Sequence, residues 1–272
     1  MSGTRWRGEI ILLAVLAACA ELKLEHVYRA GGAAAIAAMA FGTKIIPKVD
    51  KIVGPGNTYV QLAKRALAGS VGIDGFLGPS EILVLADETG RADVIASDLI
   101  AQAEHDPGSC FLLTTSEPLA QRVKTELEAQ TRVLDRADAI VNALRDRSGI
   151  LIDPSMDLLI DWANQFAAEH VSVQVQNEEE VLKKLVHAGA IFLGPFSPVA
   201  AGDYIAGPSH CLPTNTTARF SSGISVYEFL KRSSVVEYSA EGLAADAEAI
   251  VALATAEQLA GHAASVHARS AD

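Results

Sequence analysis

The sequence predicts an α/β fold with two doubly wound units, the first of them incomplete, and a C-terminal helical tail. Short apolar segments alternate with longer segments of helical periodicity, and Gly-rich turns separate them. Ala and Gly are abundant while aromatic residues are few, which suits close packing of helices on a parallel sheet. Beyond residue 222 the alternation gives way to helical segments alone. We therefore expect three regions, at 1–77, 78–222 and 223–272.

Composition excludes several classes of protein. The formal net charge is −11 and no basic stripe is present, which argues against nucleic acid as a partner because phosphate binding needs clustered Lys and Arg. The three cysteines, Cys19, Cys110 and Cys211, are odd in number, far apart and without a CxxC pair. This usage argues against a disulfide framework and a thiolate zinc site, and it fits the reducing cytoplasm.

The N-terminus resembles a targeting segment. Arg5 and Arg7 precede an apolar run at 10–20, as in a short secretory signal. The run continues into 21–25 without a linker and is too short to span a bilayer. We therefore predict a helix over 9–24 and no membrane association.

The first region is predicted to contain a strand at 27–29, a helix at 33–41, a strand from 51 and a helix at 58–68. Between the last two lies the turn from Gly54 to Asn57, with the sequence Gly-Pro-Gly-Asn. Ligands of doubly wound folds bind at the carboxyl ends of strands, where helix N-termini favour phosphates. The turn fits a nucleotide contact or a plain tight turn. Because it is not GxGxxG, the pattern alone favours the plain turn.

The second region and the tail continue the pattern. Predicted strands lie at 81–86, 110–114, 149–152, 169–173 and 190–193. Predicted helices lie at 93–105, 118–130, 139–147, 156–165, 178–188, 227–232 and 240–266. The stretch at 194–213 is predicted to be irregular, and a loop of that length is often functional. It contains Asp203 and His210.

Two polar residues are predicted to share the last turn of the helix at 93–105. Gln102 and His105 are three residues apart, so they project from one face, and Asp106 and Pro107 end the helix. An amide oxygen and an imidazole on one face can reach a single metal ion, but a metal site needs further donors. Equally, His105 could simply interact with the helix dipole. The spacing by itself favours this second interpretation.

Seven segments together change that balance. They are VDKIVGPGN at 49–57, GPSEILV at 78–84, QAEHD at 102–106, EH at 169–170, IFLGP at 191–195, GDYIAGPSH at 202–210 and SVYEFLK at 225–231. In this order they resemble the histidinol dehydrogenase family, whose members carry out the last two oxidations of histidine biosynthesis. The resemblance runs from about residue 10 to the end of the chain. It implies Rossmann-like units, the first binding NAD, and a homodimer with a shared active site.

The resemblance also implies roles for individual residues. Glu169 and His170 match the acid–base pair, and Asn57 matches an NAD contact. The matching zinc ligands are Gln102, His105 and Asp203, with His262 contributed by the partner subunit. Residues matching contacts to the substrate L-histidinol are Ser80, Gln102, His105, His170, Asp203, His210, Glu257 and His262.

The chemistry agrees with these roles. Oxidising an alcohol by hydride loss needs a base for the hydroxyl proton, and His titrates in a suitable range. Oxidising the aldehyde needs an activated water, hence a second base. Zinc with mixed N and O ligands can hold the substrate's amine and imidazole. Because adjacent residues on a strand face opposite sides, a bend must precede the strand for Glu169 and His170 to converge.

Several features depart from the family pattern. About a domain of family sequence is missing before Arg5, so we expect exposed apolar surface and a sheet edge. Ala34 stands where Gln is usual, Ala168 stands where Pro is usual, and Asn215-Thr216 replaces a Gly-containing pair. The missing part and Ala34 bear most on NAD binding.

Other interpretations therefore stay open. The chain could be an inactive homologue that acts as a metal-binding or assembly module, or a dehydrogenase of another small amino or hydroxy alcohol. Taken singly, each matched residue also has an ordinary structural interpretation, as a strand-edge, turn or surface residue. The predicted last helix carries the apolar residues Leu253, Ala256, Leu259 and Ala260, which need a surface to cover them. The resemblance supplies that surface from a second subunit.

Overall fold

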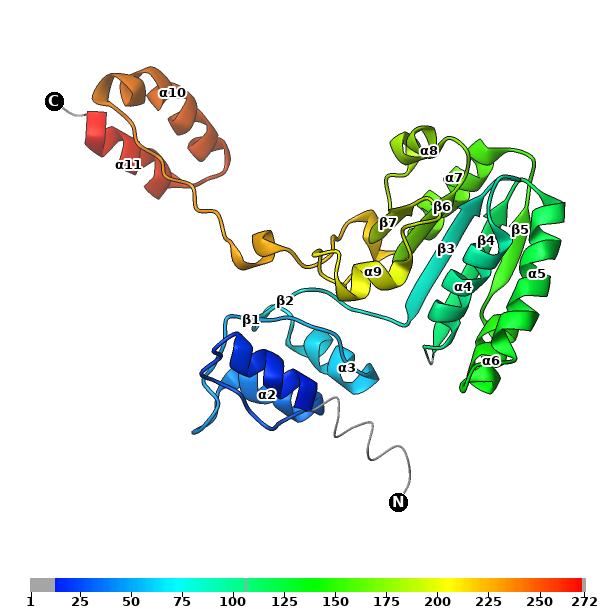
Figure 1. The fold of residues 1–272 in the computed structure, drawn as a ribbon. Coiled ribbons are helices and arrows are strands. Elements are labelled where there is room, and N and C mark those ends of the chain that lie inside the picture. The colour runs from blue at the N-terminus through cyan, green and yellow to red at the C-terminus, as the bar shows by residue number, and fades with distance from the viewer. Residues whose placement is uncertain (1–12, 106, 271–272) are drawn as a thin grey trace. The chain divides into compact units, whose positions relative to one another are not determined.

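The computed structural model describes residues 13–105 and 107–270 (Figure 1). The chain divides into two compact units, one ending at Glu228 and the other beginning at Phe229. Among the described residues, helices are either too short or too polar to cross a membrane.

The N-terminal part contains a helix over residues 13–21, followed by α2 (Gly32–Phe41), β1 (Lys51–Ile52), α3 (Thr58–Leu67) and β2 (Gly72–Ile73). The two short strands are parallel. A small core joins them to the helices through Ile36, Ala40, Ile52 and Val71. Large apolar side chains outside this core are exposed, with Leu13 66% and Leu22 70% accessible.

One prediction for this part is wrong, and one strand of this part was not predicted. Residues 26–31 have no regular structure, so the predicted strand at 27–29 is absent, because three residues without a neighbouring strand cannot form a ladder. Strand β2 was not predicted, because two residues carry no periodic pattern. Residues 9–12 of the predicted first helix lie outside the described residues.

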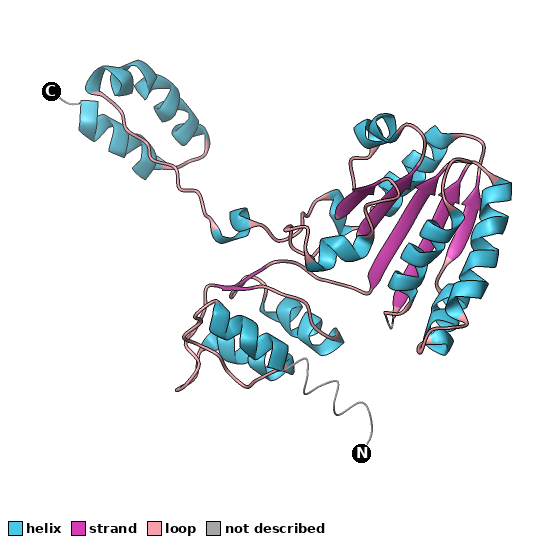
Figure 2. Cartoon of the chain, viewed as in Figure 1, coloured by secondary structure: helices cyan, strands magenta, loops and turns pink. Residues whose placement is uncertain are grey.

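The main body is a parallel sheet of five strands with helices on both faces (Figure 2). Its strands, in the order β5-β4-β3-β6-β7, are β3 (Ser80–Ala86), β4 (Gly108–Thr114), β5 (Gly149–Ile152), β6 (His170–Gln174) and β7 (Ala190–Leu193). Strand β3 is central, and it reads as a continuous apolar run from Ile82 because both of its faces are covered. The predicted doubly wound α/β fold is confirmed.

Alternating side chains of β3 fill two cores. Ile82 and Val84 face one core with α4 (Ala92–Ala103), α5 (Glu117–Thr131) and α6 (Ala137–Asp146). Leu83 and Leu85 face the other core with α7 (Met156–Phe166) and α8 (Glu178–Lys184). Because the side-chain period of a strand is two, this one strand holds both helical layers to the sheet.

The connections differ from prediction where they approach the site. Helix α4 ends at Ala103, so His105 lies beyond the helix and its N–H donates to the Gln102 carbonyl at 3.2 Å. The shared helical face predicted for Gln102 and His105 is therefore wrong. The stretch predicted to be irregular, 194–213, contains a short helix, α9 (Val199–Tyr204). Helix α8 ends at Lys184 rather than 188.

The C-terminal unit is a pair of helices. They are α10 (Ala240–Ala256) and α11 (Ala260–Ser270), and Ala254 and Val266 are buried. The single helix predicted over 240–266 is wrong, because Gln258 adopts a left-handed φ of 60° and breaks it. Leu253 remains 68% exposed. Short 3₁₀ turns at Thr217–Arg219 and Val226–Phe229 precede this unit, the second replacing the helix predicted at 227–232.

Candidate active site

Several of the predicted site residues lie at the amino ends of strands in the five-stranded sheet. Ser80 is the first residue of β3 and His170 is the first residue of β6, while His105 lies three residues before the start of β4 at Gly108. Helix α4 runs back along the sheet, so Gln102 in its last turn lies at the same edge. Doubly wound sheets usually bind ligands at the carboxyl ends of their strands. In this sheet the candidate groups lie at the opposite edge.

Glu169 and His170 are held by the backbone of one residue, Glu81. The Glu81 N–H donates to Oε2 of Glu169 at 2.9 Å, and Nδ1 of His170 lies 3.1 Å from the Glu81 carbonyl oxygen. The two side chains are 3.6 Å apart, from Nδ1 to Oε2. The chain bends before the strand, since Ala167 is left-handed and β6 begins only at His170. The prediction that a bend lets the pair converge is confirmed.

Burial shapes the charge of this pair. Loss of solvent, helped by the nearby carboxylates of Glu81 and Asp203, raises the pKa of Glu169 to about 8 against the hydrogen bond from the Glu81 backbone. Burial also lowers the pKa of His170, against the opposing effect of Asp203. Both side chains therefore favour their neutral forms. Nε2 of His170 is buried and has no hydrogen-bond partner in the described part of the chain.

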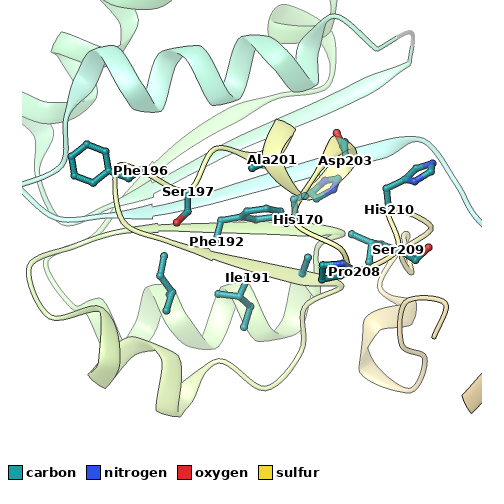
Figure 3. Close-up of a pocket in the computed structure, with 15 residues that line it drawn as sticks. His170, Ile191, Phe192, Phe196, Ser197, Ala201, Asp203, Pro208, Ser209 and His210 are labelled. Atoms are coloured by element: carbon teal, nitrogen blue, oxygen red, sulfur yellow. The ribbon is translucent and has the colours of Figure 1, made fainter. Parts of the chain in front are cut away.

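A cavity of about 450 Å³ opens beside His170 (Figure 3). Asp203 and His210 contribute polar groups to its wall, while Phe192 and Phe196 are among its apolar members. Asp203 lines this cavity together with His170 and is close enough to influence its pKa, and the centroids of the Phe192 and His170 rings are 5.9 Å apart. A cavity of this size and mixed lining accommodates a small polar molecule with a ring.

A second cavity, of about 800 Å³, is lined by Ser80, His105 and Asn57. Asn57 caps α3, because its Oδ1 accepts the N–H of Val60 at 3.1 Å. The turn before it is fixed by a buried ion pair between Lys64 and Asp74. Asp74 accepts the N–H of Gly54 at 2.7 Å, and Lys64 donates to the carbonyl of Gly54 at 2.9 Å. The capping role does not occupy the Asn57 amide nitrogen, so the predicted NAD contact stays a prediction.

The predicted zinc ligands are brought partly together. Gln102 is buried, and its Nε2 has no hydrogen-bond partner among the residues that the structure describes. His105 is exposed and Asp203 is half-buried. His105 and Asp203 both lie close enough to His170 to influence its pKa. In the described residues no three His, Cys, Asp or Glu cluster closely enough to hold a metal. Two such residues and one amide oxygen suit the donor chemistry of zinc, but a complete site needs a fourth donor.

Glu257 and His262 lie in the C-terminal unit, and both are exposed. Glu257 caps the end of α10 and His262 belongs to α11, so the prediction of one helix carrying both is wrong. Their roles as a substrate contact and a zinc ligand stay predictions.

Comparison with known proteins shows which family the chain belongs to. The family model for histidinol dehydrogenase matches residues 5–270. The chain belongs to the histidinol dehydrogenase family. Histidinol dehydrogenase of Bacillus subtilis is 49% identical over 94% of this chain, and that of Rhodopirellula baltica is 45% identical over the same share. The crystal structure of histidinol dehydrogenase from Elizabethkingia anophelis matches 90% of this chain with a TM-score of 0.86 and 40% identity.

The chain spans only part of these histidinol dehydrogenases. It covers 60% of the Bacillus subtilis protein, 56% of the Rhodopirellula baltica protein and 57% of the Elizabethkingia anophelis chain. The family resemblance recognised in the sequence is confirmed, together with this partial coverage.

Sequence reasoning on this histidinol dehydrogenase homologue missed Glu81 and Phe192. Glu81 holds the Glu169–His170 pair through its backbone, and its own carboxylate accepts the N–H of Asn215 at 3.2 Å. A carboxylate at the second position of an apolar central strand was the available signal. Nothing in the sequence distinguishes Phe192 from the other apolar residues of β7.

Proposed function

We propose that this chain carries histidinol dehydrogenase activity, oxidising L-histidinol through L-histidinal to L-histidine with zinc and NAD. The observation that carries the proposal is the buried Glu169–His170 pair held by the backbone of Glu81. Nε2 of His170 is buried beside a cavity and has no hydrogen-bond partner within residues 13–105 and 107–270, so it is suited to remove a proton from a bound alcohol.

In the first oxidation, His170 is the base for the hydroxyl proton. Its Nδ1–H donates to the Glu81 carbonyl, since a carbonyl oxygen can only accept. The other nitrogen, Nε2, therefore carries the free lone pair and takes the proton. Burial lowers the pKa of His170, which keeps this nitrogen unprotonated before the reaction.

In the second oxidation, Glu169 activates the water that adds to the aldehyde. Its Oε2 accepts the Glu81 N–H, and Ser80 also donates a hydrogen bond, so both contacts favour the charged carboxylate. Burial works in the opposite direction and raises the pKa to about 8. The aldehyde step is therefore expected to speed up as Glu169 loses its proton.

Gln102, His105 and Asp203 would hold zinc, with His262 of the partner subunit as the fourth ligand. When bound, zinc would hold the substrate's amine and imidazole, and NAD would accept the hydride of each oxidation. Ser80, His210 and the partner's Glu257 would contact the substrate, and Asn57 would contact NAD. The active protein is accordingly a homodimer, working in the cytoplasm, where free cysteines such as the three here persist.

Turnover tests the proposal. The purified chain is supplied with zinc, NAD and L-histidinol, and reduced NAD is measured. We expect about two reduced NAD for each L-histidinol consumed, and a loss of about 10²–10⁴-fold in rate for His170→Asn. Zinc binding without turnover would instead favour the inactive metal-binding module. Faster oxidation of another small amino alcohol would favour the related dehydrogenase.

A further inference from the structure

Asp98 is a buried carboxyl that the proposed chemistry does not use. It lies in α4 and only 5% of its surface is exposed. The backbone N–H of Val199 and the hydroxyl of Ser172 lie close enough to stabilise its charged form, whereas its Oδ2 has no hydrogen-bond partner among the described residues. Ser172 is fully buried and also accepts a hydrogen bond from Nε2 of Gln174 at 3.1 Å. Burying a carboxyl costs free energy unless hydrogen bonds or a paired charge compensate for the loss of water.

Asp98, Val199 and Ser172 lie on three different elements, and each is near a predicted site residue in the sequence. Asp98 precedes Gln102 by four residues on α4, and Val199 precedes Asp203 by four residues on α9. A spacing of four places two residues on one helical face, one turn apart. Ser172 follows His170 by two residues on β6, which places them on the same face of the sheet. Asp98 therefore joins the three elements that present Gln102, His170 and Asp203.

The contact between Asp98 and the N–H of Val199 provides a hydrogen-bond acceptor at the beginning of helix α9. Its N-cap residue, Pro198, provides no side-chain cap. The N–H of Val199 is one of the groups at a helix start that lack a partner within the helix, and Asp98 supplies that partner from α4.

The other end of α9 is held by a close contact. A Cβ at Gly202 would lie 2.7 Å from Cζ of Phe192, so this position packs directly on the ring that also contacts His170. Asp203, the next residue, lines the same cavity as His170 (Figure 3).

We propose that Asp98 is a positioning residue: by capping α9 and binding Ser172, it sets Asp203 relative to Gln102 and His170 for metal and substrate. The effect of Asp98 on metal and substrate rests on the proposed function. Its effect on helix α9 does not, because it concerns contacts within this chain. Groups one contact removed from metal ligands commonly change metal affinity 10- to 100-fold when they are removed.

The test compares Asp98→Ala and Asp98→Asn with Asp93→Asn, an exposed carboxylate of the same helix, as control. Two readouts are taken: amide hydrogen exchange without metal, and zinc affinity in competition with a chelator. For Asp98→Ala we expect amides of α9 to exchange at least about tenfold faster while those of α5 are unchanged. Zinc affinity should fall about 10- to 100-fold. Asn retains an acceptor oxygen, so Asp98→Asn should keep part of the exchange protection of α9 and part of the zinc affinity that Asp98→Ala loses.

Other outcomes are distinguishable. Unchanged α9 exchange and zinc affinity in Asp98→Ala would overturn the inference, as would exchange accelerated equally in α5 and α9, which indicates a general loss of stability. If the unaltered chain binds no zinc, the proposed metal site fails, and α9 exchange still decides the role of Asp98. If Asp98→Ala does not fold, Ser172→Ala removes one of the two contacts and is measured in the same way.

Discussion

Nδ1 of His170 lies 3.1 Å from the carbonyl oxygen of Glu81, across two strands that pair in parallel. The contact is short enough for a hydrogen bond, and it determines which ring nitrogen carries the proton. The neighbouring N–H of Glu81 is bound by Glu169, so one peptide segment sets the orientation of both candidate bases. The two side chains are thereby held in one geometry, and the proposed function assigns them to different steps.

The two bases should be separable by substrate. His170→Asn removes the proton acceptor of the alcohol step, so oxidation of L-histidinol should slow about 10²–10⁴-fold while oxidation of supplied L-histidinal is less affected. Glu169→Gln should show the reverse pattern, because water is no longer activated. Single-turnover rates on each substrate measure this. Equal losses on both substrates in both variants would contradict the division of roles.

Stability should depend on pH through Glu169. Its pKa is about 8 when folded and 4.5 when exposed, so between these values the folded chain binds a proton that the unfolded chain has released. The free energy of unfolding should therefore fall as pH rises through this range, by at most about 1.4 kcal/mol per pH unit. Glu169→Gln should remove this contribution. The check is urea unfolding of both chains at several pH values from about 5 to about 8.

Asp98 adds a similar dependence at lower pH, because burial raises its pKa to about 6. Asp98 is present in both the unaltered chain and Glu169→Gln, so its contribution cancels when the free energies of unfolding of the two are subtracted. Curves that stay parallel across the whole range would show that Glu169 is already ionised in the folded chain.

The shared zinc site can be tested by mixing two inactive variants. His105→Ala and His262→Ala should each bind little zinc alone. Mixed after dissociation, they should form heterodimers with one intact site, and about a quarter of the sites should recover zinc, since half of the dimers are mixed. Zinc content serves as the readout even if turnover is absent. No recovery from confirmed heterodimers would mean that His262 serves its own chain or none.

Thr216 is expected to be strained. It adopts φ 64°, a left-handed conformation that is costly for a β-branched residue, at a pair where the family usually has Gly. Thr216→Gly should raise the free energy of unfolding by about 1 kcal/mol, net of the greater flexibility of Gly in the unfolded chain. Thermal unfolding measures it. Thr216→Ala is the matched control, since Ala removes the branch but keeps the Cβ. A lower melting temperature for the Gly variant would refute the strain.

The local patterns of the sequence predicted much of the fold. Strands β5 and β7 have the predicted bounds, 149–152 and 190–193, because apolar runs between Gly or polar breakers specify their own limits. The family motifs, read in order, identified the family that the comparisons confirm. Strand bounds depend on neighbouring residues, and family membership depends on the order of motifs along the chain. Neither requires knowledge of which segments come into contact.

The tertiary structure decided what meets at the site. Glu81 reaches Glu169 across 88 residues only because β3 pairs with β6, and strand order is not written in any local pattern. Strand pairing alone placed Glu81 and Ser172 beside the site, and packing of α9 against Phe192 and Asp98 gave a helix where the sequence suggested a loop. Long-range packing and hydrogen bonding outweigh local propensity when the segment is only one or two turns long.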